Sequence, residues 1–293
     1  MLADLRSQDL PMNDELHTAL RQLVLAAGPE WSPAIEKSLA NSKSQILAIA
    51  PIGEAETENS CMRLGGRPLM PPDFTWPRDR AGQYMQFLLQ VDIKGITPPE
   101  QAAVSIPAGG CLTVFRSDQI LTMADKDRKA FHCHFEGDKS GKIILSAPDQ
   151  NQQLPPLKGQ TFTVEAGWAL DLERLNYETL AFALPQNFAM ALLGWAEKYN
   201  LSICAAGHFF GSAKNLEEEK EICAFAAGGI SYDRNRARDS HYSHLVALKD
   251  NWILLARINE RGLFDTAVAT TDILIQKEDL AQGLFERAWV ISR

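Results

Sequence analysis

Two histidines separated by one residue are the sequence's nearest approach to a metal site. His132 and His134 alternate with Phe131, Cys133 and Phe135, so a strand here would place both imidazoles on one face, about 7 Å apart along the chain. That spacing suits zinc, which often binds pairs of imidazoles. The apolar residues should take the core face, however, and no third ligand can be assigned from the sequence. We interpret the histidines as a solvent-facing pair, keep them as weak candidate ligands, and predict no metal and no other cofactor.

A basic island could bind charged groups. Arg234, Arg236 and Arg238 alternate with other residues, and three guanidinium groups can hold a phosphate or acidic side chains through charge-assisted hydrogen bonds. The surrounding residues 228–243 begin with two glycines and carry both signs of charge, which predicts a loop. We favour a solvated loop and keep the three arginines as candidates for ligand or partner binding.

A glycine- and proline-rich segment precedes the most strand-like part of the chain. Its defining residues are Gly65, Gly66, Pro68, Trp76 and Pro77. Glycine permits a positive φ and proline fixes φ, so the segment can turn tightly into a sheet; glycine also lets a ligand approach backbone amides. Neither Gly-x-Gly-x-x-Gly nor Gly-Lys-Ser/Thr follows a strand here, so this is not a nucleotide-binding loop. We interpret these residues as structural before functional.

The strand after this segment carries two polar residues on one face. Gln90 and Asp92 could bind a polar ligand in a cleft, together with Arg63 and Arg67 upstream. They could equally satisfy backbone groups beneath the proline-rich segment, and the sequence leaves both interpretations open. No Gly-x-Ser-x-Gly or His-Glu-x-x-His motif is present, although catalytic residues can also assemble in space. Catalysis is therefore undecided, with the sequence favouring a protein that is not an enzyme.

Hydrophobic periodicity predicts the elements that would position these residues. It predicts helices over residues 13–27, 33–40 and 185–199, and strands over 46–52, 86–93, 111–116, 161–170, 252–258 and 272–276. Helices and strands do not alternate regularly, which favours a strand-rich α+β fold with mixed or antiparallel sheets.

The predicted organisation has three parts. Residues 1–50 form an N-terminal helical segment, residues 51–150 a first strand-rich half, and residues 151–293 a second half that contains helix 185–199. Residues 87–92 and 253–259 share an apolar strand pattern, and each follows a glycine-rich turn. We therefore expect two pseudo-related halves in one compact unit.

Composition limits the class of protein. The chain has 293 residues, 45% of them hydrophobic, and a formal net charge of -8. It can therefore bury a sizeable core, and its acidic balance argues against a general nucleic-acid or anionic-membrane binder, since either would need a basic face. It has no run of about 18 apolar residues that would span a membrane. Its N-terminus is polar and its five cysteines form no CxxC pair, so we expect a cytoplasmic protein with reduced thiols.

Three motifs resemble the YwqG-like family. They are Gly65-Gly66-x-Pro68, Trp76-Pro77 and the strand Phe87-Leu88-x-Gln90. The resemblance supports two related halves and names no established biochemical activity. In the second half the family's Gly-Gly-Tyr-Pro type of turn is reduced to residues 207–211 without a proline, and Gln90 has Arg257 as its approximate counterpart.

The function that we expect is non-catalytic binding of another protein inside the cell. The resemblance implies an immunity or antitoxin role with a cognate toxin as partner, since some YwqG-like proteins accompany bacterial toxin systems. An acidic inhibitor associates quickly with a basic toxin because electrostatic attraction steers the encounter. The alternative is an enzyme or small-ligand-binding protein with a cleft near Gln90 and Asp92.

Overall fold

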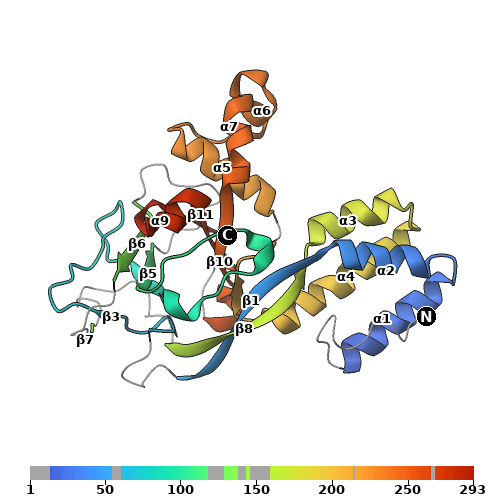
Figure 1. Cartoon of the computed structure of the whole chain (residues 1–293), viewed down its shortest axis with the longest axis horizontal. Helices are drawn as coiled ribbons and strands as arrows, with labels where there is room; N and C mark the ends of the chain where they lie inside the picture. The colour runs from blue at the N-terminus through green and yellow to red at the C-terminus, as the bar shows by residue number, and fades with distance from the viewer. Residues whose placement is uncertain are drawn as a thin grey trace.

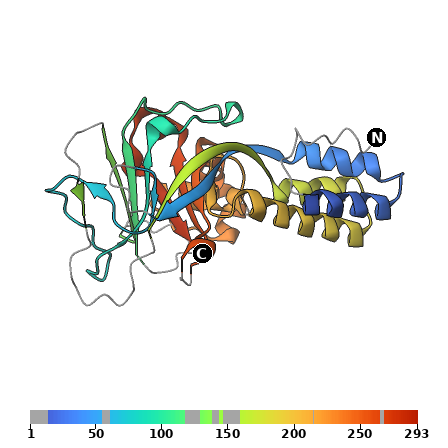
Figure 2. The ribbon, with the colours of Figure 1, turned by 90° about the horizontal axis from the view of Figure 1, so that it is seen from below.

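The computed structural model describes residues 14–54, 61–117, 129–137, 143–145, 159–213, 215–264 and 268–293. The chain folds into a large, nearly barrel-shaped antiparallel sheet and a helical arm that extends from one side of it (Figure 1, Figure 2). The predicted α+β class is therefore confirmed. Among the described residues, none of the helices is both long and apolar enough to cross a bilayer.

The helices are α1 (Asp14–Ala27), α2 (Ser32–Asn41), α3 (Leu172–Ala181), α4 (Gln186–Ile203), α5 (Leu216–Ala227), α6 (Arg234–Arg238), α7 (Ser243–Ala247), α8 (Glu260–Leu263) and α9 (Lys277–Gln282). The strands are β1 (Lys43–Glu54), β2 (Arg63–Leu64), β3 (Leu69–Met70), β4 (Gln86–Asp92), β5 (Cys111–Arg116), β6 (Phe131–Glu136), β7 (Ile143–Ile144), β8 (Gln160–Leu170), β9 (Gly207–Phe209), β10 (Trp252–Ile258), β11 (Thr271–Gln276) and β12 (Trp289–Ser292). Short 3₁₀ helices are η2 (Ile93–Gly95), η3 (Glu100–Ala102), η4 (Ser240–Tyr242), η5 (Leu248–Asn251) and η6 (Phe285–Arg287).

Ten of these strands form one sheet in the order β12-β11-β10-β9-β1-β8-β2-β4-β5-β6. Every neighbouring pair in it is antiparallel. The two outermost strands approach each other through side chains, because the ring centroids of Phe131 on β6 and Trp289 on β12 lie 5.9 Å apart. The sheet therefore curls almost onto itself around a single large core.

The glycine- and proline-rich segment covers the outer face of this sheet. All six residues of β5 are buried: Leu112 and Val114 face the large core, whereas Phe115 packs with Met70 and Trp76 in a separate cluster. A strand covered on both faces loses the alternation of apolar and polar residues that marks a half-exposed strand. Because the proline-rich segment covers its outer face, β5 is buried on both faces and does not alternate regularly between apolar and polar residues.

Two long strands connect the sheet to the helical arm. β1 and β8 pair along their whole length, from Lys43 opposite Leu170 to Glu54 opposite Gln160, and run from the sheet to the helices (Figure 2). There, α1 packs on α2 and α4, and α3 also packs on α2 and α4, which makes a four-helix bundle. Its core is a cluster of apolar side chains distinct from the core of the sheet. The indole of Trp195 on α4 donates a hydrogen bond to the carbonyl of Leu16 on α1, at 2.9 Å.

One predicted loop contains helical structure. Residues 228–243 include α6 and η4, and the Asp233 side chain caps α6 by accepting hydrogen bonds from the backbone N–H groups of Asn235 and Arg236. An aspartate whose side chain bonds the backbone N–H groups that follow it is a strong helix start signal, which is why this segment is helical rather than a loop. The proposed division at residues 50 and 150 stays a prediction.

Candidate functional site

Gln90, the central polar residue of the predicted cleft, is fully buried and engaged within the fold. Its side-chain amide exchanges two hydrogen bonds with the backbone of Leu69, at 2.9 and 2.8 Å, and donates a third to the hydroxyl of Thr113 at 2.9 Å. Gln90 therefore satisfies backbone groups of the proline-rich segment, as the second of the two sequence interpretations describes.

The other candidates near Gln90 do not converge on it as a polar cleft. Arg63 is buried, burial lowers its guanidinium pKa, and one of its N–H groups donates to the carbonyl of Arg67 at 3.2 Å. The Arg67 side chain is exposed. Asp92 caps η2 by accepting a hydrogen bond from the Lys94 backbone at 3.0 Å.

The structural motif of the segment is tightly packed. The indole of Trp76 donates to the carbonyl of Met85 at 2.8 Å, and its ring meets Phe115 edge-on with centroids 5.1 Å apart. Gly65 and Gly66 both have positive φ, of 60° and 72°. Pro68 is buried, and Pro77 is half-buried.

The two strand histidines lie on one face, as their spacing predicts. Their rings stack with centroids 6.3 Å apart, but His134 is half-buried against Phe74 rather than fully turned to solvent. The proline-rich segment that supplies Phe74 covers this side of β6, which sequence alternation alone could not reveal. Within the described parts of the chain, no three His, Cys, Asp or Glu side chains are grouped so that they could hold a metal ion.

The basic island lies on the surface away from these residues (Figure 1). Arg234 forms a bidentate ion pair with Glu218 on α5, with nitrogen–oxygen distances of 2.8 and 3.0 Å, and this hydrogen bonding lowers the pKa of Glu218. Arg236 donates to the carbonyl of Ser231 at 3.0 Å. Arg238 is exposed, so the three guanidinium groups do not form one shared site.

A buried charged centre that sequence reasoning missed joins the second half of the sheet to α5. Arg257 on β10 forms a bidentate ion pair with fully buried Asp272 on β11, with Nε–Oδ1 and Nη2–Oδ2 distances of 2.6 and 2.5 Å. The carboxylate of Glu219 on α5 is also fully buried, and lies 3.8 Å from Arg257 and 3.0 Å from Arg293. Burying a charge is costly unless it is paired, so the buried Asp272 carboxylate depends on Arg257.

Burial shifts two pKa values in this centre in opposite directions. It lowers the pKa of His208, beside Arg257 on the adjacent strand, to about 4. Burial and the neighbouring Asp272 raise the pKa of Glu219 to about 9. In both cases burial favours the uncharged form. The imidazole is therefore neutral near pH 7, and its Nδ1 lies 2.8 Å from the carbonyl of Phe210.

A small cavity of about 230 Å³ opens beside His208. Its polar lining is already used by the fold: Asn200 exchanges two hydrogen bonds with the backbone of β8, and Asn259 donates one to the carbonyl of Cys204. Burial raises the pKa of the Cys204 thiol to about 12, so it stays protonated at neutral pH and is a poor nucleophile. This cavity therefore offers little catalytic chemistry.

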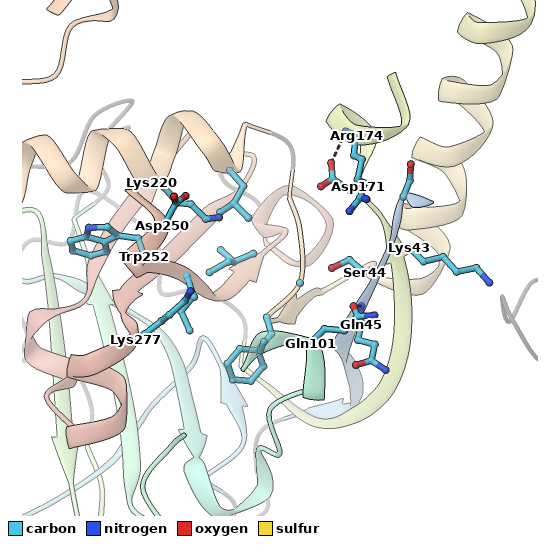
Figure 3. Close-up of a pocket in the computed structure, with 17 residues that line it drawn as sticks. Lys43, Ser44, Gln45, Gln101, Asp171, Arg174, Lys220, Asp250, Trp252 and Lys277 are labelled. Carbon is cyan, nitrogen blue, oxygen red and sulfur yellow. Dashed lines mark hydrogen bonds between the residues drawn. The ribbon is translucent and has the colours of Figure 1, made fainter. Parts of the chain in front are cut away.

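A larger groove of about 510 Å³ lies between the arm and the sheet (Figure 3). Lys220 on α5 and Lys277 on α9 line it on the side of the sheet, and Arg174 on α3, Asp171 and Ser44 line it on the opposite side. These residues come from elements far apart in the chain, so no sequence spacing could have indicated the groove. One lining residue does have a recognisable sequence role: Asp171 caps α3 by accepting a hydrogen bond from the Arg174 backbone N–H at 2.9 Å.

The arm also carries an unusual share of exposed apolar side chains. Among the described residues, eight large hydrophobic side chains are exposed, and five of them lie on the arm. They are Leu25, Tyr177, Leu180, Met190 and Leu201. All lie on α1, α3 and α4, where α4 packs between the other two. Single exposed apolar residues are ordinary, but five of the eight lie on three helices of this one bundle.

Fold and surface together define an α+β protein with a curled antiparallel sheet and an exposed helical arm. Residues 62–292 match the family DUF1963, described as a domain of unknown function, and the chain belongs to that family. The matched range begins after α1, α2 and β1, so half of the bundle lies outside it. No curated protein matches the chain.

Proposed function

We propose that this chain is a non-catalytic binding protein that recognises another protein through its helical arm. The observation that carries the proposal is the concentration of exposed apolar side chains on α1, α3 and α4. Tyr177 and Leu180 are 71% and 69% exposed, and Met190 on the adjoining helix is 62% exposed. Covering such side chains with a partner would remove them from water, which is the main favourable contribution to association.

Charge indicates what kind of partner suits this surface. The four arm helices, residues 14–41 and 172–203, contain seven acidic and four basic residues. A partner with an apolar centre and a basic rim would match both features, and its approach would be steered electrostatically. An immunity or antitoxin role is one form of this function, with a cognate toxin as the basic partner and the cytoplasm as the location. We propose that the chain is also YwqG-like, and the immunity or antitoxin role depends on that resemblance.

The alternative function, an enzyme or small-ligand binder centred on Gln90 and Asp92, has less support. The amide of Gln90 is bonded to Leu69 and Thr113, and Asp92 caps η2. A ligand at this position would have to displace the backbone of β3 from Gln90, leaving buried polar groups without partners.

We also propose that the sheet consists of two related halves that exchange their long strands. The sheet order reads alike in both directions from the central β1–β8 pair, with β9 and β10 on one side and β2 and β4 on the other. Register shifts occur at Leu88 in β4 and at Leu255 in β10. The carbonyl of Leu88 accepts a hydrogen bond from the backbone N–H of Gly65 at 2.8 Å, and the carbonyl of Leu255 accepts one from Phe210 at 3.2 Å. Both donor residues have positive φ.

The same correspondence relates the two polar centres. Gln90 pairs in register with Arg63 and Thr113, and Arg257 pairs with His208 and Asp272. The proposal therefore makes Arg257 the counterpart of Gln90, as the sequence comparison of the two strands suggests. The uncharged amide centre of the first half is replaced by the charged centre of the second.

The binding proposal is tested by co-expression with the protein encoded beside this chain's gene. We expect the two proteins to co-purify, and toxicity of the neighbour to be suppressed. Leu180→Asp with Met190→Asp should weaken the complex at least about tenfold, since charged groups in an apolar interface centre are costly. The matched control is Leu248→Asp, a 44% exposed leucine on η5 outside the arm, which should bind normally.

Two results would contradict the proposal. One is a neighbour that neither co-purifies nor loses toxicity, which removes the immunity form. The other is a complex that the arm variants leave intact, which removes the arm as the binding surface. Circular dichroism of each variant establishes that it is folded before binding is compared.

A further inference from the structure

We infer that the groove between the arm and the sheet is a second binding site, which takes a small organic anion with carboxylate or phosphate groups. Its volume of about 510 Å³ lies within the range of about 300–1,000 Å³ that is usual for small-molecule sites. This site is separate from the protein-binding surface proposed above, because its lining residues include none of the five exposed apolar residues of the arm.

Cationic residues line the groove from three different elements. They are Arg174 on α3, Lys220 on α5 and Lys277 on α9. Lys43 on β1 also borders the groove, but its side chain points away from it (Figure 3), and its amine lies 5.9 Å from the centre of the Trp168 ring. Two carboxylates, Asp171 and Asp250, line the groove as well.

Two of the cations have no partner in the part of the chain that the structure describes. Among the described residues, neither the guanidinium of Arg174 nor the amine of Lys277 forms a hydrogen bond or an ion pair. Lys220, by contrast, is held by Glu217 at 2.8 Å, and the carboxylate of Asp171 is occupied in capping α3. Arg174 and Lys277 are therefore the groups available to a ligand, and guanidinium and ammonium groups favour carboxylate and phosphate oxygens.

The two available cations stand on opposite walls. Lys277 projects from the side of the sheet and Arg174 from the side of the arm, with the groove between them (Figure 3). A ligand with an anionic group at each end would match the placing of these two cations.

Isothermal titration calorimetry of the full chain tests the inference with two probes, citrate and inorganic pyrophosphate. We expect saturable binding of at least one, and the preferred probe distinguishes a carboxylate from a phosphate ligand. Arg174→Gln and Lys277→Gln should each weaken binding at least about tenfold, whereas Lys277→Arg should retain it. The matched control is Lys198→Gln, an exposed lysine on α4 outside the groove, which should bind as the unaltered chain does.

Absence of saturable binding of both probes up to about 10 mM would overturn the inference, since that affinity is weaker than a specific site requires. Equal weakening by Lys198→Gln would also overturn it, because the effect would then be a loss of net charge. Arm variants Leu180→Asp and Met190→Asp should leave anion binding unchanged. The failure of either proposal can therefore be recognised without reference to the other.

Discussion

Arg116 and Glu260 form a bidentate ion pair that is buried almost completely, although 144 residues separate them in the sequence. Arg116 belongs to β5 and Glu260 to α8, and the Nε–Oε1 distance is 2.9 Å. The hydroxyl of Thr271 also donates to Glu260. The pair therefore bonds the strands of the first half of the sheet to the helix that follows β10.

Removing one member of this pair should be strongly destabilising. Glu260→Gln leaves the Arg116 guanidinium buried without a counter-charge, and we expect the free energy of unfolding to fall by about 3–5 kcal/mol. Urea denaturation of the purified proteins measures the change. The double variant Arg116→Met with Glu260→Leu should recover much of the loss, and a single variant as stable as the parent would contradict this role.

The buried imidazole of His208 should make the fold sensitive to acid. Its pKa is about 4 in the folded protein and about 6.5 in an unfolded chain. Protonation thus favours the unfolded state, so the stabilisation is present above pH 6.5 and is lost as the pH falls towards 4, by up to about 3 kcal/mol. His208→Asn should flatten the stability profile between these pH values. An unchanged slope would show that other groups govern acid unfolding.

Glu219 should act at the opposite end of the pH range. Its pKa is about 9 when folded and about 4.5 in its ordinary state, so the folded protein binds the proton more tightly. The stabilisation that the protonated Glu219 gives to the fold is fully present below pH 4.5 and is lost as the pH rises through 9. Glu219→Gln keeps an uncharged side chain of similar shape, and its stability should fall less between pH 6 and about 9. Parallel profiles of the variant and the parent would exclude a proton on Glu219.

Gly66 should tolerate substitution less well than another glycine of similar conformation. Gly66 and Gly82 have φ values of 72° and 77°, but a Cβ on Gly66 would lie 2.7 Å from the Cα of Gly159, whereas one on Gly82 would have no atom within 4 Å. Gly82→Ala should therefore cost about 1 kcal/mol from backbone strain alone, and Gly66→Ala about 1–3 kcal/mol more. Equal midpoints in thermal melts would disprove the close approach.

The exchange of long strands predicts how the chain behaves when divided. β1 pairs with β8 and β9, and β8 also pairs with β2, so each half contributes a strand to the other. Residues 1–150 and 151–293, produced as two chains, should co-purify as a folded complex and should each fail to fold alone, because an unpaired central strand exposes its backbone groups. Cooperative melting of either fragment by itself would contradict the proposed exchange.

The sequence determined the local elements with good accuracy. Residues 111–116 were predicted as a strand and form β5 with the same bounds, and the predicted helix 13–27 is α1 to within one residue. Both depend on a short-range pattern of apolar side chains, since the periods of 3.6 and 2 residues are fixed by backbone geometry. The common face of His132 and His134 follows from the same geometry.

Only the tertiary structure decided what the polar residues do. The sequence left Gln90 equally suited to a ligand and to the backbone, and the structure shows its amide hydrogen-bonded to the backbone of Leu69. It gave no indication that Arg174 and Lys277 face one groove, or that Arg116 meets Glu260. Leu69 and Gln90 lie 21 residues apart and Arg116 and Glu260 lie 144 residues apart, so these contacts depend on how the sheet curls and which strands pair. No local spacing of residues encodes that closure, because it results from the burial of the whole core.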